Sequence, residues 1–177
     1  DVYKRQLKVH TTFQPDTTIV KSMARLGLTF RVSNAYDQVS YLGRGDNETY
    51  IDRNQSGKIG VYQTTPERMF HYYVAPQSTS NRTDVRWVKL ADTSGEGIFV
   101  ESDRAFQFSI IPFSDVLLEK ARHINELERN GKITVHLDAK QAGVGTATCG
   151  PGVQSQYLVP LTKQTFDFII YPVKNRE

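Results

Sequence analysis

The chain has little of the residue types that build many small catalytic and metal sites. Its 177 residues include one cysteine, one tryptophan and four histidines. A single cysteine forms neither an internal disulfide nor a CxxC pair, and the histidines show no short metal-ligand spacing. We therefore expect no metal site and no cofactor in this chain. The histidines are interpreted as surface residues or hydrogen-bonded core residues.

Long apolar runs and clusters of like charge are missing as well. No stretch approaches the roughly 18 apolar residues that cross a bilayer. The net charge is only +3, and no run of five or six basic residues occurs. A nucleic-acid surface needs a concentrated basic stripe. We expect neither a membrane nor a nucleic acid as a partner.

What the sequence does have is a series of short segments in which apolar and polar residues alternate. A length of 177 residues, with 38% apolar and 23% charged residues, suits one globular domain. Many short strands separated by turns indicate an all-β sandwich or barrel. The expected strands are 7–13, 17–20, 26–32, 39–42, 59–63, 85–90, 98–101, 106–111, 133–137 and 166–171, with 102–105 as a hairpin turn.

One segment departs from the strand pattern. Ser114 and Asp115 can cap a helix, and apolar residues then follow at helical spacing as far as Leu127. Gly131 is suited to end it. We expect one helix, or two short helical turns, over an edge of the sheet.

Residues 41–53, with the sequence YLGRGDNETYIDR, combine two glycines with many charged groups. We expect the strand to break at Gly43 and Gly45, since glycine adopts positive φ freely. The simplest interpretation of the rest is a tight corner closed by a largely buried Asp52–Arg53 pair. The alternative is a pair between the carboxylate of residue 48 and the guanidinium of residue 44.

Glu48 and Asp52 are also candidates, by spacing alone, for the carboxylate pair that a glycosidase needs on either side of its sugar. Neighbouring arginines would keep both carboxylates ionised, and a glycosidase acid needs a raised pKa. The residues alone therefore do not point to a catalytic pair here.

Residues 41–53 resemble the W-x-G-x-G-P-x-E-x-Y-x-D-R signature of the small-chain domain of LacZ-type β-galactosidases (glycoside hydrolase family 2). Asp46 stands where that family usually has proline. Three further segments match in the same order, and the resemblance runs from about Leu7 to Val173. They are Ala24–Gly27 for P-R-x-G, Pro76–Trp87 for P-Q-x-x-x-N-R-x-D-V-R-W, and Gly143–Pro151 for G-x-G-G-D-D-S-W-G-P.

The resemblance implies a large twisted antiparallel β-sandwich of the galactose-mutarotase type over residues 26–174. Residues 1–25 would then be N-terminal strands that connect from a preceding domain. It also implies the C-terminal domain of a β-galactosidase that hydrolyses terminal β-galactosides such as lactose. In that family both catalytic glutamates lie in a separate barrel, so no catalytic residue is expected here and the chain alone should be inactive.

The partners that the resemblance implies are the other domains of the same enzyme and a galactoside substrate. The full-length enzyme is expected to be a homo-oligomer. A bacterial source follows from the resemblance, and it leaves the cytoplasm and the periplasm both open.

Four residues are assigned to substrate binding through the resemblance: Glu48, Asn81, Arg82 and Cys149. An arginine fork beside an asparagine amide suits a sugar hydroxyl or a facing loop. The alternative is that Asp84 pairs with Arg82 or the arginine at 86 and merely locks this loop.

Cys149 stands where the family has a tryptophan that reaches the barrel and stacks on the sugar. A thiol has no aromatic face, so another aromatic residue would have to supply that platform. Glycines surround Cys149 on both sides, which predicts a projecting loop and a thiol that reacts in the folded protein.

Two other functions stay open. One is a stand-alone sugar mutarotase, in which His71 or His136 would act with Glu48 or Glu101. The other is a carbohydrate-binding or structural module without a role in the active site.

Overall fold

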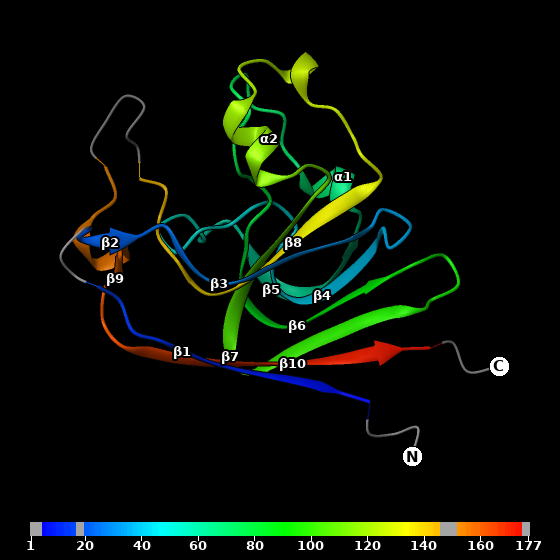
Figure 1. Ribbon diagram of the computed structural model, residues 1–177, viewed down its shortest axis with the longest axis horizontal. Coiled ribbons are helices and arrows are strands. Elements are labelled where there is room, and N and C mark those ends of the chain that lie inside the picture. The colour runs from blue at the N-terminus through cyan, green and yellow to red at the C-terminus, as the bar shows by residue number, and fades with distance from the viewer. Residues whose placement is uncertain (1–4, 17–19, 146–151, 175–177) are drawn as a thin grey trace.

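The computed structural model describes residues 5–16, 20–145 and 152–174 (Figure 1). Part of the expected strand 17–20 lies outside these residues, and so does Cys149. The elements are β1 (Leu7–Phe13), β2 (Ser22–Met23), β3 (Arg25–Ser33), β4 (Gln38–Gly45), β5 (Lys58–Thr64), α1 (Pro66–Met69), β6 (Arg82–Ala91), β7 (Gly97–Ile111), α2 (Asp115–Lys120), η2 (Ile124–Glu126), β8 (Lys132–Gln141), η3 (Ser155–Tyr157), β9 (Val159–Pro160) and β10 (Gln164–Val173).

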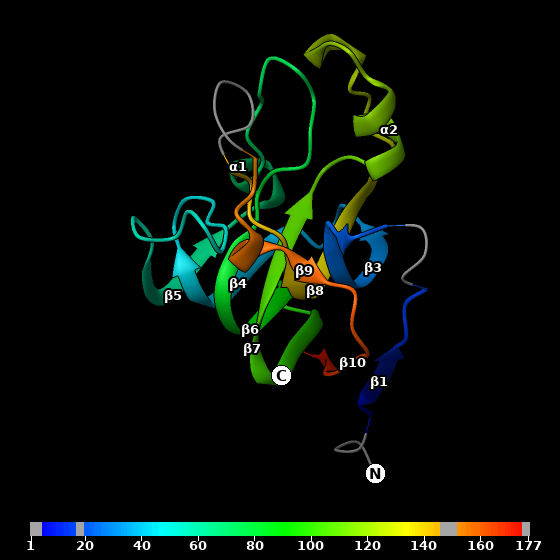
Figure 2. The same ribbon diagram turned by 90° about the vertical axis from the view of Figure 1, so that its left-hand side faces the viewer.

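Eight strands form one antiparallel sheet that divides at β7. Its main path runs β1-β10-β7-β6-β4-β5, while β8 pairs with both β7 and β3. The first half of β7 pairs with β10 through residues 97–101, and the second half pairs with β8 through residues 107–111. The two wings therefore diverge from β7, as Figures 1 and 2 show. The all-β, large antiparallel architecture expected from the sequence is confirmed.

The expected hairpin between 98–101 and 106–111 is wrong, because β7 is one continuous strand of 15 residues. In the pairing with β6, Val85 lies opposite Phe106 but Trp87 lies opposite Glu101. Residues 102–105 therefore form a large bulge instead of a turn. A bulge bends a strand sharply, and here it lies where β7 changes partner from β10 to β8.

The helical segment takes the second form expected for it, two short turns. The Ser114 hydroxyl caps α2 by accepting from the Leu117 amide, and the helix ends at Lys120 before the separate η2 turn. Leu118 is its buried residue and belongs to a small apolar cluster with Phe70, Ile111 and Phe113. The four-residue α1 was not expected.

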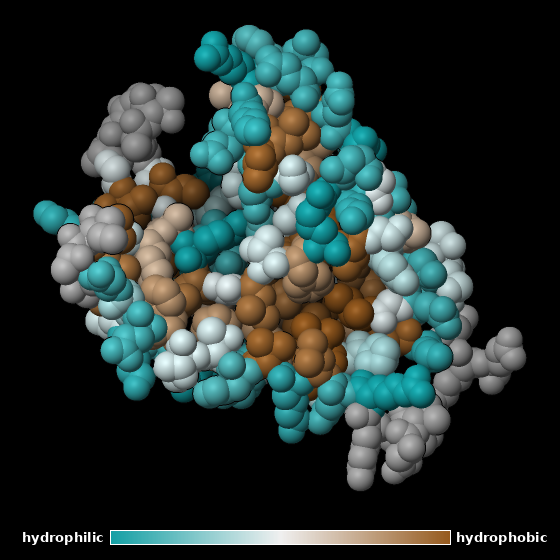
Figure 3. Space-filling model, in the orientation of Figure 1, coloured by the Kyte–Doolittle hydropathy of each residue, from teal (hydrophilic) through white to brown (hydrophobic). Residues whose placement is uncertain are grey.

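The main core lies between the two wings of the sheet. Large, fully buried side chains of this core include Tyr41, Phe108, Leu137 and Phe168. Several apolar residues packed against it are only half buried: Leu28, Phe30, Val32, Tyr36, Ile98 and Ile170. Figure 3 shows apolar surface on the corresponding face, between β3 and β10. Part of the core is thus open to solvent in this chain.

Gly43 and Gly45 do not break β4, which continues through both. That expectation is wrong, and neither glycine has a positive φ. Glycine is needed for a close approach instead. A Cβ on Gly43 would lie 2.8 Å from Cγ2 of Val85, and one on Gly45 would overlap the Tyr41 hydroxyl. The sheet is therefore packed too closely here for a side chain.

Candidate functional site

Three of the sequence motifs are bonded to one another in the structure. They lie in the turn after β4, the segment 70–81 before β6 and residues 142–145 after β8. Strands β4, β6 and β8 carry these segments to the same place although up to about 90 residues separate them in sequence. The contacts below show how they are held together.

Glu48 joins the first two motifs. Its Oε1 accepts from the Tyr73 hydroxyl and from Arg53 Nη2, each at 2.7 Å. Its Oε2 accepts from the Ser80 backbone N–H at 3.1 Å and from the Tyr50 hydroxyl at 3.4 Å. The side chain is only 16% exposed. A carboxylate with four donors around it fixes the segment 70–81 to the turn after β4.

The same carboxylate affects the two tyrosines that donate to it. The hydrogen bond to Glu48 raises the pKa of the Tyr73 hydroxyl, and burial adds to the rise. Burial raises the pKa of the Tyr50 hydroxyl, and the nearby charge of Glu48 raises it further. Both hydroxyls stay protonated at neutral pH and act as donors.

Asn81 is 1% exposed and links the turn to the inside of the sheet. Its Nδ2 donates to the Thr49 carbonyl at 2.9 Å and to Gln107 Oε1 at 2.8 Å. Its Oδ1 is buried and has no hydrogen-bond partner in the described part of the chain. Asn81 therefore bonds protein groups, and its substrate-binding assignment stays a prediction.

Arg82 is 2% exposed and donates to four protein oxygens. Nε bonds the Tyr41 hydroxyl at 3.0 Å, and Nη2 bonds the Asp46 carbonyl at 2.6 Å. Nη1 donates to the carbonyls of Ser80 and Asn81. The guanidinium ties the turn after β4 to the start of β6, and its assignment to substrate also stays a prediction.

Asp52 joins the first motif to the third. Its carboxylate accepts from the backbone N–H groups of Val144 at 3.1 Å and Gly145 at 2.7 Å. A Cβ on Gly143 would overlap this carboxylate, and Gly145 has a φ of +60°. Both glycines are therefore required by the way in which Asp52 holds the segment.

The expected Asp52–Arg53 pair is wrong. Arg53 pairs with Glu48 at 2.7 Å and its side chain is 54% exposed. The alternative Glu48–Arg44 pair is also wrong, because Arg44 pairs with Asp84 at 2.7 Å. Asp84 consequently does not lock its loop through Arg82 or the arginine at 86. Adjacency in sequence did not identify these partners, because Arg53 pairs with Glu48 across the same turn and Arg44 pairs with Asp84 on another strand.

A second polar cluster lies deeper, between β3, β7 and β8. His136 is fully buried, with Nδ1 3.2 Å from Arg25 Nη1 and Nε2 3.0 Å from Asp115 Oδ2. Arg25 Nη2 lies 2.9 Å from Asp138 Oδ2, an ion pair without well-formed hydrogen-bond geometry. Burial lowers the pKa of His136 to about 3 and raises that of Asp138 to about 6.

The histidines named for a mutarotase lie apart from the named carboxylates. His71 is exposed and its ring packs on Tyr73 at 4.3 Å between centroids. Among the described residues, no histidine bonds Glu48 or Glu101 directly. His71 reaches Glu48 only through Tyr73. The mutarotase alternative stays a prediction.

Several residues that hold this site were not indicated by any sequence motif. Tyr73 and Ser80 bind Glu48, and Gln107 binds Asn81, yet none of them was assigned a role from the motifs. In the described ranges, no group of three or more His, Cys, Asp or Glu side chains could hold a metal ion. No helix in these ranges is long and apolar enough to span a membrane. The hydrogen bonds of this site show how the segments that carry the motifs are positioned relative to one another.

Comparisons with known proteins connect these motifs to one family. A family model described as β-galactosidase small chain matches residues 1–170. A β-galactosidase of Actinobacillus pleuropneumoniae is 30% identical over 135 residues, which are 76% of this chain and 13% of that protein. One of Bifidobacterium adolescentis is 35% identical over 139 residues, again 76% of this chain and 13% of that protein. One of Vibrio cholerae is 36% identical over 123 residues, 70% of this chain and 11% of that protein. The match thus spans only a small fraction of the length of these relatives.

Proposed function

The chain belongs to the β-galactosidase small-chain family, and on that premise we propose that it is one domain of a β-galactosidase and forms part of the wall of its active-site entrance. The relatives it matches are named β-galactosidases. The substrate would be a terminal β-D-galactoside. The catalytic glutamates would lie in a barrel domain outside this chain.

The observation that carries this proposal is the Asp52 contact. The carboxylate of Asp52, in the motif at residues 41–53, accepts hydrogen bonds from the backbone of Val144 and Gly145, in the motif that begins at Gly143. A further hydrogen bond holds the start of the same segment, because the Gly143 amide donates to the Tyr157 carbonyl at 2.9 Å. A loop that presents a group to a neighbouring active site needs a base that is held in this way.

The other residues that were assigned to substrate binding support the same role indirectly. Glu48 holds the segment 70–81, and Arg82 and Asn81 hold the turn that carries Asp52. Their part in substrate binding would then be to position the loops. Cys149 lies outside the described residues, and its direct contact with substrate stays a proposal.

Packing against other domains of the same enzyme is supported by the open part of the core. Half-buried Phe30, Val32 and Ile170 lie on that face. Covering apolar area stabilises an interface by about 25 cal/mol per Å² removed from water. A neighbouring domain on this face would complete the core.

The first test compares the isolated chain with the intact protein. The intact protein is expected to cleave o-nitrophenyl β-D-galactoside, and the isolated chain is expected to show no turnover above background. The reason is that the acid and the nucleophile are proposed to lie outside this chain. Turnover by the isolated chain that is lost in Glu48→Gln would contradict the proposal, and so would an inactive intact protein.

A further inference from the structure

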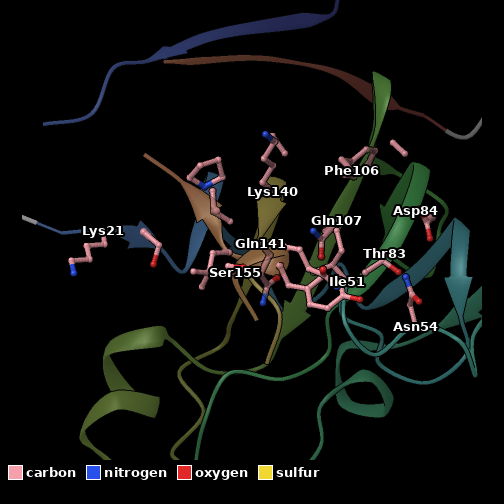
Figure 4. Close-up of a pocket in the computed structure, with 18 residues that line it drawn as sticks. Lys21, Ile51, Asn54, Thr83, Asp84, Phe106, Gln107, Lys140, Gln141 and Ser155 are labelled. Carbon is pink, nitrogen blue, oxygen red and sulfur yellow. The ribbon is translucent and has the colours of Figure 1, made fainter. Parts of the chain in front are cut away.

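A cavity lies beside the site, and Ile51, Thr83 and Asp84 of the family motifs form part of its lining. It has a volume of about 670 Å³ and lies between the segment 155–160 and strands β6, β7 and β8. Figure 4 shows its side chains, with Lys21 at one end and Asp84 at the other. Cavities of 300 to 1,000 Å³ are the usual size of small-molecule sites.

One buried amide that lines this cavity, that of Gln107, has its orientation fixed by its hydrogen-bond partner. The Thr49 carbonyl can only accept, so the Asn81 side chain must turn its NH₂ group toward it. The same NH₂ group donates to Gln107, which must therefore offer its Oε1. Gln107 is 8% exposed and lines the cavity. Its own NH₂ group has no partner among the described residues and is left as a donor to the cavity.

A second amide is held in the same way. Arg25 has only donors, and its Nη2 bonds Gln141 Oε1 at 3.2 Å. Gln141 lines the cavity, and within the described chain its NH₂ group also has no partner. Two amides with fixed orientation thus present donors and no acceptors.

The charge of the lining agrees with these donors. Lys21 and Lys140 are both exposed and line the cavity. The one carboxylate in the lining belongs to Asp84, which is paired with Arg44 at 2.7 Å. The lining therefore has two oriented amide donors and a surplus of positive charge, beside hydroxyl and amide groups at Ser22, Asn54, Ser155 and Gln156 that can donate or accept.

We propose that this cavity binds a short acidic oligosaccharide of two or three sugar units that bear carboxylates. The hydroxyl and carboxylate oxygens would accept from Gln107, Gln141 and Lys140. The half-buried ring of Tyr157 and the exposed Ile51 give apolar wall for the C–H faces of the sugars. Such a ligand matches the volume, the donors and the charge together.

Titration calorimetry on the intact protein tests this, with tri-α-galacturonate as the probe and maltotriose as a neutral trisaccharide control. Neither probe is a β-galactoside, so hydrolysis does not interfere. Tri-α-galacturonate is expected to bind at least about tenfold more tightly than maltotriose, and added salt should weaken its binding. Absence of binding, or equal binding of both probes, would overturn the proposal.

Matched variants locate the binding. Gln107→Glu keeps the acceptor for Asn81 but replaces the donor by negative charge, so it should weaken binding roughly tenfold or more. Lys140→Gln should weaken it by up to about fivefold. Lys132→Gln removes the same charge from the same strand outside the cavity and should change nothing.

Thermal unfolding shows whether each variant is folded. If Gln107→Glu does not fold, the comparison of Lys140→Gln with Lys132→Gln decides alone. Equal effects of these two lysine variants would overturn the proposal. A structure of the intact protein in which another segment of its chain fills the cavity would overturn it too.

Discussion

Replacement of Arg82 by methionine is expected to lower the free energy of unfolding by about 3 to 5 kcal/mol. The guanidinium is 2% exposed and donates to the Tyr41 hydroxyl and to the carbonyls of Asp46, Ser80 and Asn81. Each buried acceptor left without a donor costs about 1 to 3 kcal/mol. Part of this loss is offset because burial of the cation also costs free energy.

Arg86→Met is the matched control, since Arg86 lies on the same strand but is exposed. Surface substitutions usually change stability by about 0.5 kcal/mol or less. Urea unfolding of the two variants beside the wild-type protein measures the difference. Similar losses in both variants would mean that the Arg82 hydrogen bonds do not hold the turn after β4.

Acidification from pH 7 to pH 4 is expected to destabilise Asp138→Asn by about 2 kcal/mol more than the wild-type protein. Burial raises the pKa of Asp138 to about 6, with Arg25 opposing the rise. Its pKa in the unfolded chain is about 3.9. The folded state therefore takes up a proton first, and the wild-type protein gains stability as pH falls through this window, at about 1.4 kcal/mol per unit.

His136 has the opposite effect. Burial, aided by Arg25, lowers its pKa to about 3, against about 6.5 in the unfolded chain. Its contribution to stability is complete above pH 6.5 and is lost as pH falls toward 3. In the wild-type protein the two groups offset each other between about pH 6 and pH 4. Asp138→Asn lacks the gain in stability that Asp138 provides, so only the loss of stability caused by His136 remains.

Urea unfolding at pH 7, 6, 5 and 4 measures this difference. Asp103→Asn, at an exposed position on β7, is the control and should follow the wild-type protein across the range. Parallel curves for Asp138→Asn and the wild-type protein would show that Asp138 titrates at its ordinary pKa. The cluster around Arg25 would then be more solvated than its burial indicates.

Alternation of apolar and polar residues was sufficient to predict most of the sheet. Strands β1, β3, β8 and β10 lie where that pattern indicated. It failed at β7, because Ser102 and Asp103 favour a turn, whereas residues 102–105 here form a bulge between two strand halves. No local pattern distinguishes such a bulge from a hairpin turn, because the partners on either side decide it. The four-residue α1 was too short to leave a periodic signal.

The motifs identified segments that form the site, but they did not identify which residues bond one another. The motifs located Glu48, Asp52 and the glycines near Val144, while the pairing of charges was wrong. Asp52 binds amides more than 90 residues away, and Arg53 binds Glu48 instead. Tertiary structure selects these partners, so adjacency in sequence carries little information about them. Gln107 had no motif around it and was visible only once the sheet was assembled.

The central claim is that Asp52 positions the loop after Val144 for a neighbouring active site. The most direct measurement is the steady-state kinetics of Asp52→Ala in the intact protein with o-nitrophenyl β-D-galactoside. Loss of both hydrogen bonds to the loop base should reduce kcat/KM by about tenfold or more, since a bond to a charged group contributes about 1.5 to 3 kcal/mol. Asp103→Ala, at an exposed site, should leave kcat/KM unchanged. If Asp52→Ala stays folded and keeps the wild-type kcat/KM, the loop has no role at the active site and the account is contradicted.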